Sequence, residues 1–260
     1  MTETETAPQP VSHRPSGSDP AVPDNLASAS PGALTTPASL VIHTVHAQRL
    51  VQGRSKSKEH APIVGLIRFG WKMNLLWHAA KADDPYADWF LLRTHDVLQQ
   101  VNKDLVDQQR SILAQMQCHS AVEIGVGRTK EVIRVPLNFG NPYGYMAAYL
   151  LGDFDNLIRT VLTMMHVGIQ PRSAGYALIE KSSSAVRRVF YEPFGWKNVS
   201  LTREDLRQGN QRALQAEKVM GPLPVEILEG TRRAPFAPPL AQKTIVSKTK
   251  AVRKKTAVGP

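Results

Sequence analysis

A long stretch without proline or glycine most constrains how this 260-residue chain can fold. It begins after Asp84-Pro85 and runs to Cys118. Within it, four apolar residues recur at intervals of seven: Leu91, Leu98, Leu105 and Ile112. An apolar stripe at this spacing is typical of a helix that has one side in a protein core or in a helix–helix seam. The sequence therefore predicts one long helix of about 40 Å, at roughly 1.5 Å per residue.

Three carboxylates, Asp83, Asp84 and Asp88, lie at the start of this stretch, in ADDPYADWFLLR. Grouped carboxylates can bind hard cations or serve as an acid–base pair. However, no histidine or further carboxylate follows at ligand spacing. Asp84 before Pro85 instead matches a helix N-cap with proline at the first helical position, and Asp88 lies in the first turn, where negative charge is favourable. We therefore expect a structural role and no metal.

The two ends of the chain differ from its middle in composition. Residues 1–38 are rich in Pro, Ser, Thr and Ala and carry a net charge of −3. Residues 241–260 carry six basic side chains and no acidic one. Neither end has apolar periodicity, so we expect a disordered acidic arm over 1–38, one mainly helical domain over 39–240, and a disordered basic tail over 241–260. The tail residues expected to attract phosphate without sequence preference are Lys248, Lys250, Arg253, Lys254 and Lys255.

The net charge of +10 points to an anionic partner. Because the tail carries +6 and the arm −3, residues 39–240 carry +7, so the expected domain is basic as well. Nucleic acid is a common partner of such a protein, although a basic surface that serves only solubility is the alternative. No uncharged stretch approaches the roughly 20 residues of a membrane span, and no signal peptide is recognisable, so a cytoplasmic protein is expected.

After the long helix the spacing of the apolar residues changes to every second position, which marks a strand. Ile133, Val135, Leu137 and Phe139 alternate with Val132, Arg134, Pro136 and Asn138, and Lys130 precedes them, which predicts a half-exposed strand with a polar, partly basic face. A second strand that leads into a loop is expected over 39–54. Together with the helices, these strands predict a mainly α protein with a short β element.

Further helices are predicted on both sides of this strand. A helix over 62–81 should face the core with Ile63, Leu66, Ile67, Trp71 and Leu75. Asn141-Pro142 should start another helix, broken at Gly152-Asp153, with a following helix that ends at Gly168. The expected later helices cover 172–190 and the region from Thr202 to Gly221, and an extended proline-rich segment follows over 221–239.

Enzymatic function is not expected. The chain has no visible nucleophile–base pair or metal cluster, and GVGR at 125–128 lacks the spacing of a phosphate-binding loop. No catalytic residue and no cofactor are therefore predicted.

Several short motifs together resemble a known family. They are RLVQGR, IVGLIRF, DDPYADWFLL, PYGYMAAYLL, VRRVF and VMGPLP followed by RRAPFAP, spread over residues 40–239. This combination resembles the integrating conjugative element proteins related to the AcaB transcriptional regulators. The resemblance implies a protein carried by a mobile element. It also implies a DNA-binding regulator of transfer genes with a ribbon-helix-helix core, embedded here in a helical domain.

In a ribbon-helix-helix dimer, one strand from each chain enters the major groove. On this model the strand over 130–138 would turn its polar side chains toward double-stranded DNA in a homodimer, and a second helix would start near Asp153. The candidate DNA-binding residues are Lys130, Arg134 and Asn138 on the strand, with Arg187 and Arg188 on a later helix. The alternative is that the strand pairs within its own chain, with residues 39–46.

Two non-enzymatic functions follow. The first is a DNA-binding regulatory or maintenance protein of a conjugative element, which could contact other proteins of that element. The second is a protein-interaction component of the conjugation machinery, in which the long helix and the proline-rich segment 221–239 would be docking surfaces.

Overall fold

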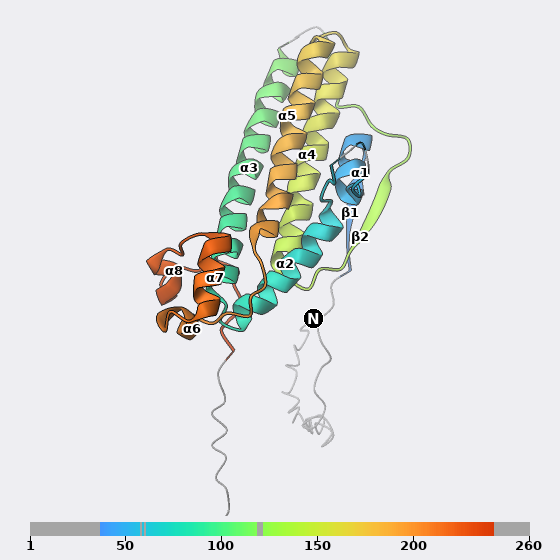
Figure 1. Cartoon of the computed structure of the whole chain (residues 1–260). Coiled ribbons are helices and arrows are strands. Elements are labelled where there is room, and N and C mark those ends of the chain that lie inside the picture. Colours follow the sequence, from blue (N-terminus) through green and yellow to red (C-terminus); the bar gives the residue numbers. More distant parts are fainter. Residues whose placement is uncertain (1–36, 58, 60, 119–121, 242–260) are drawn as a thin grey trace, which may run out of the picture. The chain divides into compact units, whose positions relative to one another are not determined.

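The computed structural model describes residues 37–57, 59, 61–118 and 122–241 (Figure 1). The expected acidic arm lies outside these residues except for its last two positions, and the expected basic tail lies outside them except for Ala241. The described residues belong to one compact unit, which begins at Pro37.

The described residues form eight α-helices and one two-stranded sheet, which confirms a mainly α fold with a short β element. The elements are β1 (Ala38–Ile42), α1 (Val45–Gln52), α2 (Leu66–Lys81), α3 (Pro85–Gln117), β2 (Ile133–Leu137), α4 (Pro142–His166), α5 (Arg172–Tyr191), a 3-10 helix (Glu192–Gly195), α6 (Arg203–Arg207), α7 (Gln211–Met220) and α8 (Val225–Glu229).

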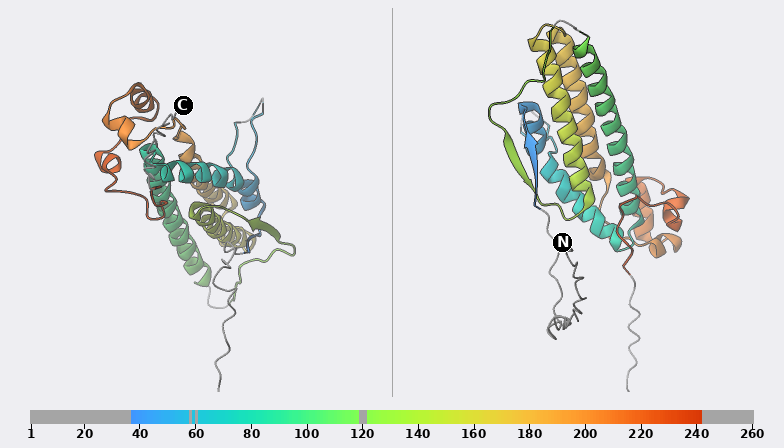
Figure 2. Two further views of the ribbon diagram at one scale, coloured as in Figure 1. Left: turned by 90° about the horizontal axis from the view of Figure 1, so that it is seen from below. Right: turned by 180° about the vertical axis from the view of Figure 1, so that it is seen from behind.

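The helices α3, α4 and α5 lie side by side, and α2 crosses them near one end (Figures 1 and 2). The sheet lies along α4 on the side of α1, while α6, α7 and α8 gather near the start of α3. The predicted stripe of α3 is buried at Leu91, Leu98, Leu105 and Ile112, so these residues form core within one chain. The N-cap prediction is also confirmed, because the Asp84 carboxylate accepts hydrogen bonds from the first-turn backbone N–H groups.

The predicted break at Gly152-Asp153 is wrong, since α4 runs without interruption from Pro142 to His166, 25 residues in all. A glycine inside a helix costs only about 1 kcal/mol relative to alanine. The buried side chains of Leu151, Phe154 and Leu157 on either side offset that cost. Consequently no second helix of a ribbon-helix-helix unit begins near Asp153.

The structure corrects the predicted face of α2. Ile67, Trp71 and Leu75 are 54%, 59% and 39% exposed, while Phe69 and Met73 are fully buried. This helix is apolar on most of its surface, so periodicity alone cannot choose which side packs. Tertiary packing decides instead, because Gly70 lets the Phe139 ring approach so closely that a Cβ would lie 2.3 Å from a ring carbon.

Residues 45–52 form the helix α1, where an extended segment and loop were predicted. Thr44 caps this helix by accepting a hydrogen bond from the backbone N–H of Ala47. Asp155 of α4 is buried and accepts bonds from the backbone N–H groups of His43 and Thr44 and from the Thr44 hydroxyl, at 2.6 to 2.9 Å. This carboxylate therefore fixes the junction between β1 and α1 against the bundle.

The region after α5 is folded onto the beginning of α3. Asp88 is fully buried and pairs with Arg203 and Arg233, and Arg203 also pairs with Asp83. The Tyr86 hydroxyl donates a hydrogen bond to the Gly221 carbonyl. The proline-rich segment 221–239, predicted as extended, thus contains the short helix α8 and packs against the bundle.

Candidate nucleic-acid interface

The strands β1 and β2 pair antiparallel within one chain. Leu40 lies opposite Val135, and Val41 lies opposite Arg134. The sequence left open whether this strand pairs with the same strand of a second chain or with residues 39–46 of its own chain. In the structure it pairs within its own chain. The antiparallel ribbon is therefore already formed by a single copy of the protein.

The two faces of this ribbon have different surroundings. Leu40, Val135 and Leu137 pack against the hydrophobic core from one face. Ile133 is on the same side of β2 by its position in the strand but is 42% exposed, so the expected burial fails at the strand's beginning. The opposite face carries Arg134, which is exposed as predicted.

The other two predicted strand residues flank β2 and do not belong to it. Lys130 lies three positions before the strand, Asn138 follows its last residue, and both are exposed. The structure therefore places Arg134 in the hydrogen-bonded ladder of the ribbon, with Lys130 and Asn138 in the segments on either side of β2.

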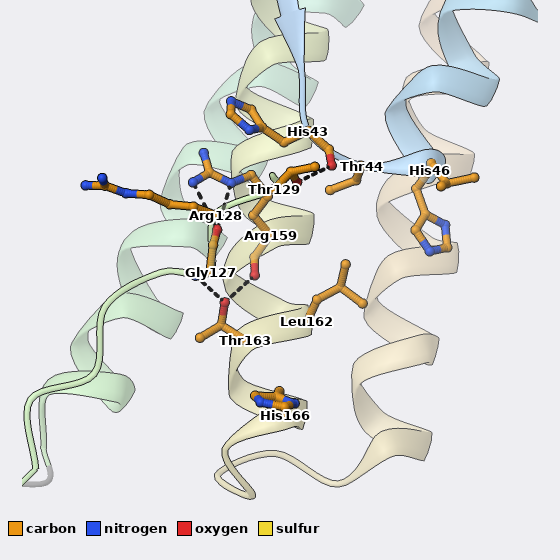
Figure 3. Close-up of a pocket in the computed structure, with 11 residues that line it drawn as sticks. His43, Thr44, His46, Gly127, Arg128, Thr129, Arg159, Leu162, Thr163 and His166 are labelled. Carbon is orange, nitrogen blue, oxygen red and sulfur yellow. Dashed lines mark hydrogen bonds between the residues drawn. The ribbon is translucent and has the colours of Figure 1, made fainter. Parts of the chain in front are cut away.

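Hydrogen bonds hold the segment before β2 against α4 (Figure 3). The Gly127 N–H donates to the Thr163 hydroxyl at 2.9 Å, and the Arg159 guanidinium donates to the Gly127 carbonyl. The Thr129 hydroxyl donates to the His43 carbonyl at 2.8 Å. These bonds leave the Arg128 side chain pointing away from the other residues drawn in Figure 3.

A cavity of about 430 Å³ lies between this segment, the β1–α1 junction and α4. Its lining includes Arg128, Arg159, His43, His46 and His166, and none of the described residues that line it is acidic. Burial and the nearby Arg49 lower the pKa of His46, although Glu180 opposes this effect. Arg128 and Arg159 carry positive charge in this region, because a guanidinium stays protonated at neutral pH.

The structure separates the two arginines predicted on the later helix. Arg187 lies on the side of α5 that faces α1, where it pairs with Glu180 at 2.6 Å. Arg188 is exposed and lies on the side that faces α3, beside Leu105 and Gln108. Neighbours in sequence on a helix point about 100° apart, so the two side chains leave α5 in different directions.

Sequence reasoning missed Arg128 and Arg159, which line the cavity beside the ribbon, and Arg49 on α1. Arg128 stands two positions before Lys130, and its proximity could have suggested it. Arg49 and Arg159 come from helices far apart in the chain, and only the packing of α1 on α4 brings them to the same region.

In the part of the chain that the structure describes, no group of three or more His, Cys, Asp and Glu side chains is arranged to hold a metal ion. Of the described helices, none combines the length and the apolar character needed to cross a membrane.

Comparisons with known proteins agree with this architecture. A family model described as transcriptional regulator AcaB matches residues 30–241. The crystal structure of selenomethionine-containing AcaB from uropathogenic E. coli resembles the fold with a TM-score of 0.53 and 12% sequence identity, over 76% of this chain and 98% of that chain. A search of curated proteins gives no match. The chain belongs to the AcaB family of transcriptional regulators.

Proposed function

We propose that the protein is a DNA-binding regulator of the transfer genes of an integrating conjugative element, with double-stranded DNA and a second copy of the chain as its partners. Three properties support this function. The family is one of transcriptional regulators, residues 39–240 carry +7, and an arginine stands on the outer face of a two-stranded ribbon.

The exposed Arg134 on this ribbon is the observation that carries the proposal. The major groove of B-DNA is about 12 Å wide and admits a two-stranded β-ribbon. Because the inner face of the ribbon is packed on the helices, the outer face can enter a groove without exposing the core. An arginine there can bind the O6 and N7 atoms of guanine with two hydrogen bonds.

The residues around the ribbon suit the phosphate backbone. Lys130 is exposed beside the ribbon, and the Arg128 side chain projects from a segment that hydrogen bonds hold in place. Such contacts fix the orientation of a protein on DNA, while base contacts supply the sequence preference. The tail residues Lys248, Lys250, Arg253, Lys254 and Lys255 would add attraction to any DNA sequence.

A homodimer is compatible with this arrangement. In the described residues each strand of the ribbon has one neighbour, so each retains an unpaired edge. β2 contains Pro136, which has no N–H to donate, whereas β1 contains no proline. Pairing of β1 with β1 of a second copy would therefore extend the two-stranded sheet to four strands across a two-fold axis.

A protein-interaction component of the conjugation machinery is the second candidate, and the apolar stripe of α2 favours it. Ile67, Trp71 and Leu75 lie at intervals of four and are exposed, which is the spacing of a helix face that binds a partner. The surfaces first expected to dock are less available, because the stripe of α3 is buried and the segment 221–239 is packed on the bundle.

A salt-titrated binding assay separates the two candidates. Labelled duplexes from the transfer region and unrelated duplexes of the same length would be titrated with the full-length protein by fluorescence anisotropy. A DNA-binding regulator should prefer at least one transfer-region duplex, and its affinity should fall steeply with salt. Equal binding of all duplexes, or no binding at low salt, would favour the interaction component.

A further inference from the structure

A second cavity, of about 380 Å³, is lined by α1, α5 and the segment that follows α1, and it shares His46 with the first cavity. His46, Arg49 and Leu50 form its first wall, Gly53, Arg54 and Ile63 its second, and Glu180, Ser183 and Arg187 of α5 its third. The second wall is a closed backbone element, because Arg54 and Ile63 exchange two backbone hydrogen bonds of 2.8 Å.

Positive charge exceeds negative charge in this cavity. Three arginines line it, and Glu180 is the one carboxylate among the described lining residues. Glu180 pairs with Arg187 at 2.6 Å. Arg49 and Arg54 form no ion pair with any side chain that the structure describes, although Arg54 donates one hydrogen bond to the Ala61 carbonyl. Two of the three guanidinium groups therefore have no ion-pair partner among the described residues.

One other polar group of the cavity is already engaged. The Ser183 hydroxyl donates to the Ile179 carbonyl at 2.7 Å, so its proton is not available to a ligand. The side-chain donors that a ligand would meet are thus the guanidinium N–H groups and the imidazole of His46. Arginine presents its donors as a planar fork that suits phosphate oxygens, and several arginines from different directions suit a tetrahedral anion.

We propose that this cavity, walled by α1, α5 and the 53–63 bridge, binds the phosphate group of a small phosphorylated molecule through Arg49, Arg54 and Arg187. The volume of about 380 Å³ is within the range of roughly 300–1,000 Å³ that is usual for small-molecule sites. It exceeds the space needed for a phosphate group alone, so an organic body of modest size fits beside Leu50 and Ile63.

The phosphate could also belong to the DNA backbone, and the shape of the cavity argues for the small molecule. Walls on three sides favour a ligand that enters as a whole, whereas a DNA phosphate remains attached to a broad duplex. The ribbon residue Arg134 is not part of this lining, and the site goes beyond the DNA-binding function proposed above. It can be tested on free protein without DNA.

The test is calorimetric titration of the full-length protein with inorganic phosphate and with phenyl phosphate at constant ionic strength. Histidine-labelled protein would report the place of binding through the ring resonances of His46, which lines both cavities, compared with those of His43 and His166, which line only the first; a shift at His46 alone indicates the second cavity. Three variants accompany the parent. Arg49→Gln removes a donor, Glu180→Gln removes the competing carboxylate, and Arg110→Gln is a matched control on α3 with a 74% exposed side chain.

One saturable site per chain is expected, with His46 resonances that shift on binding. Arg49→Gln should weaken binding about tenfold, as for loss of a charge-assisted hydrogen bond. Glu180→Gln should tighten binding, and Arg110→Gln should leave it unchanged. Opposite effects of the first two variants are not expected from a change in folding alone.

Two results would overturn the proposal. The first is absence of a saturable site, or equal binding by the parent and all three variants, which would indicate general attraction to a basic protein. The second is a result in which neither phosphate nor phenyl phosphate binds, while Arg49→Gln weakens binding to duplex DNA. That result would assign the cavity to the DNA backbone.

Discussion

Replacement of Asp88 by Asn tests what holds the C-terminal region on the bundle. The Asp88 side chain is fully buried and accepts hydrogen bonds from Arg203 at 2.5 Å and from Arg233 at 2.8 and 2.9 Å. Asparagine keeps the size of the side chain but removes the negative charge. Its amide also places N–H donors against guanidinium donors. Both arginines would then lose their shared counter-charge.

The expected loss follows from burial. Removal of one partner from a buried ion pair costs about 3–5 kcal/mol. Arg203 is 5% exposed but keeps its pair with Asp83, and Arg233 is 21% exposed, so water screens part of its charge. These two features place the expected loss at the lower end, about 3 kcal/mol.

Urea unfolding followed by tryptophan fluorescence would measure this loss, since Trp196 is buried and donates a hydrogen bond to Asp84 beside the network. Asp96→Asn is the matched control, because Asp96 pairs with Arg232 at 3.9 Å with both side chains more than half exposed. An exposed pair contributes about 0–1 kcal/mol. If Asp88→Asn costs no more than Asp96→Asn, the network does not hold the region in place.

Three further predictions concern packing, pH and the tail. Phe69→Ala should cost about 3–5 kcal/mol and Trp71→Ala less than about 1 kcal/mol, because Phe69 is fully buried and Trp71 is 59% exposed; equal losses in thermal unfolding would contradict the observed face of α2. Burial raises the pKa of Asp84 from 3.8 to about 6, so the folded protein favours the protonated side chain. The stability that this protonated group contributes is fully present below pH 4 and is lost as pH rises through 6. Asp84→Asn keeps a cap acceptor and should gain stability relative to the parent by up to about 3 kcal/mol between pH 4 and 7, and parallel stability curves would refute this. Deletion of residues 241–260 should weaken binding to all DNA sequences alike and flatten its salt dependence, and an unchanged salt slope would show that the tail does not contact DNA.

Local signals in the sequence account for the parts of the fold that were predicted correctly. Asp84 and Asn141 each precede a proline and accept the first-turn hydrogen bonds of α3 and α4. Thr202 and Asp205 form a capping box at the start of α6, where a helix was predicted to begin. Each of these interactions joins residues two or three positions apart, so the sequence contains all the information that they need.

Errors arose where distant contacts decide the structure. Gly152 stays helical because α4 is buried along its length, and Gly70 selects the buried face of α2 through Phe139. Asp88 was predicted only as a first-turn carboxylate, but Arg203 and Arg233 reach it from more than 100 positions away. A single sequence does not show such pairs.

Part of the candidate site was predictable because its signals are local in the sequence. The alternation over 133–137 identified the strand and the outward direction of Arg134. The partner strand β1 and the two cavities beside α1 depend on the packing of elements from both halves of the chain. The separation of Arg187 from Arg188 was predictable in principle from helix geometry alone.

The most direct test of the proposed function is the affinity of Arg134→Ala for the transfer-region duplex that the parent prefers. Arg134 is exposed on the outer face of the ribbon, so the variant should keep the parent's melting temperature. Loss of a base contact should cost about 1–3 kcal/mol and relax the preference at one base position, whereas loss of a phosphate contact should weaken binding to all sequences. Arg110→Ala, on α3, should bind like the parent. If Arg134→Ala binds this duplex as tightly as the parent does, the ribbon does not contact DNA.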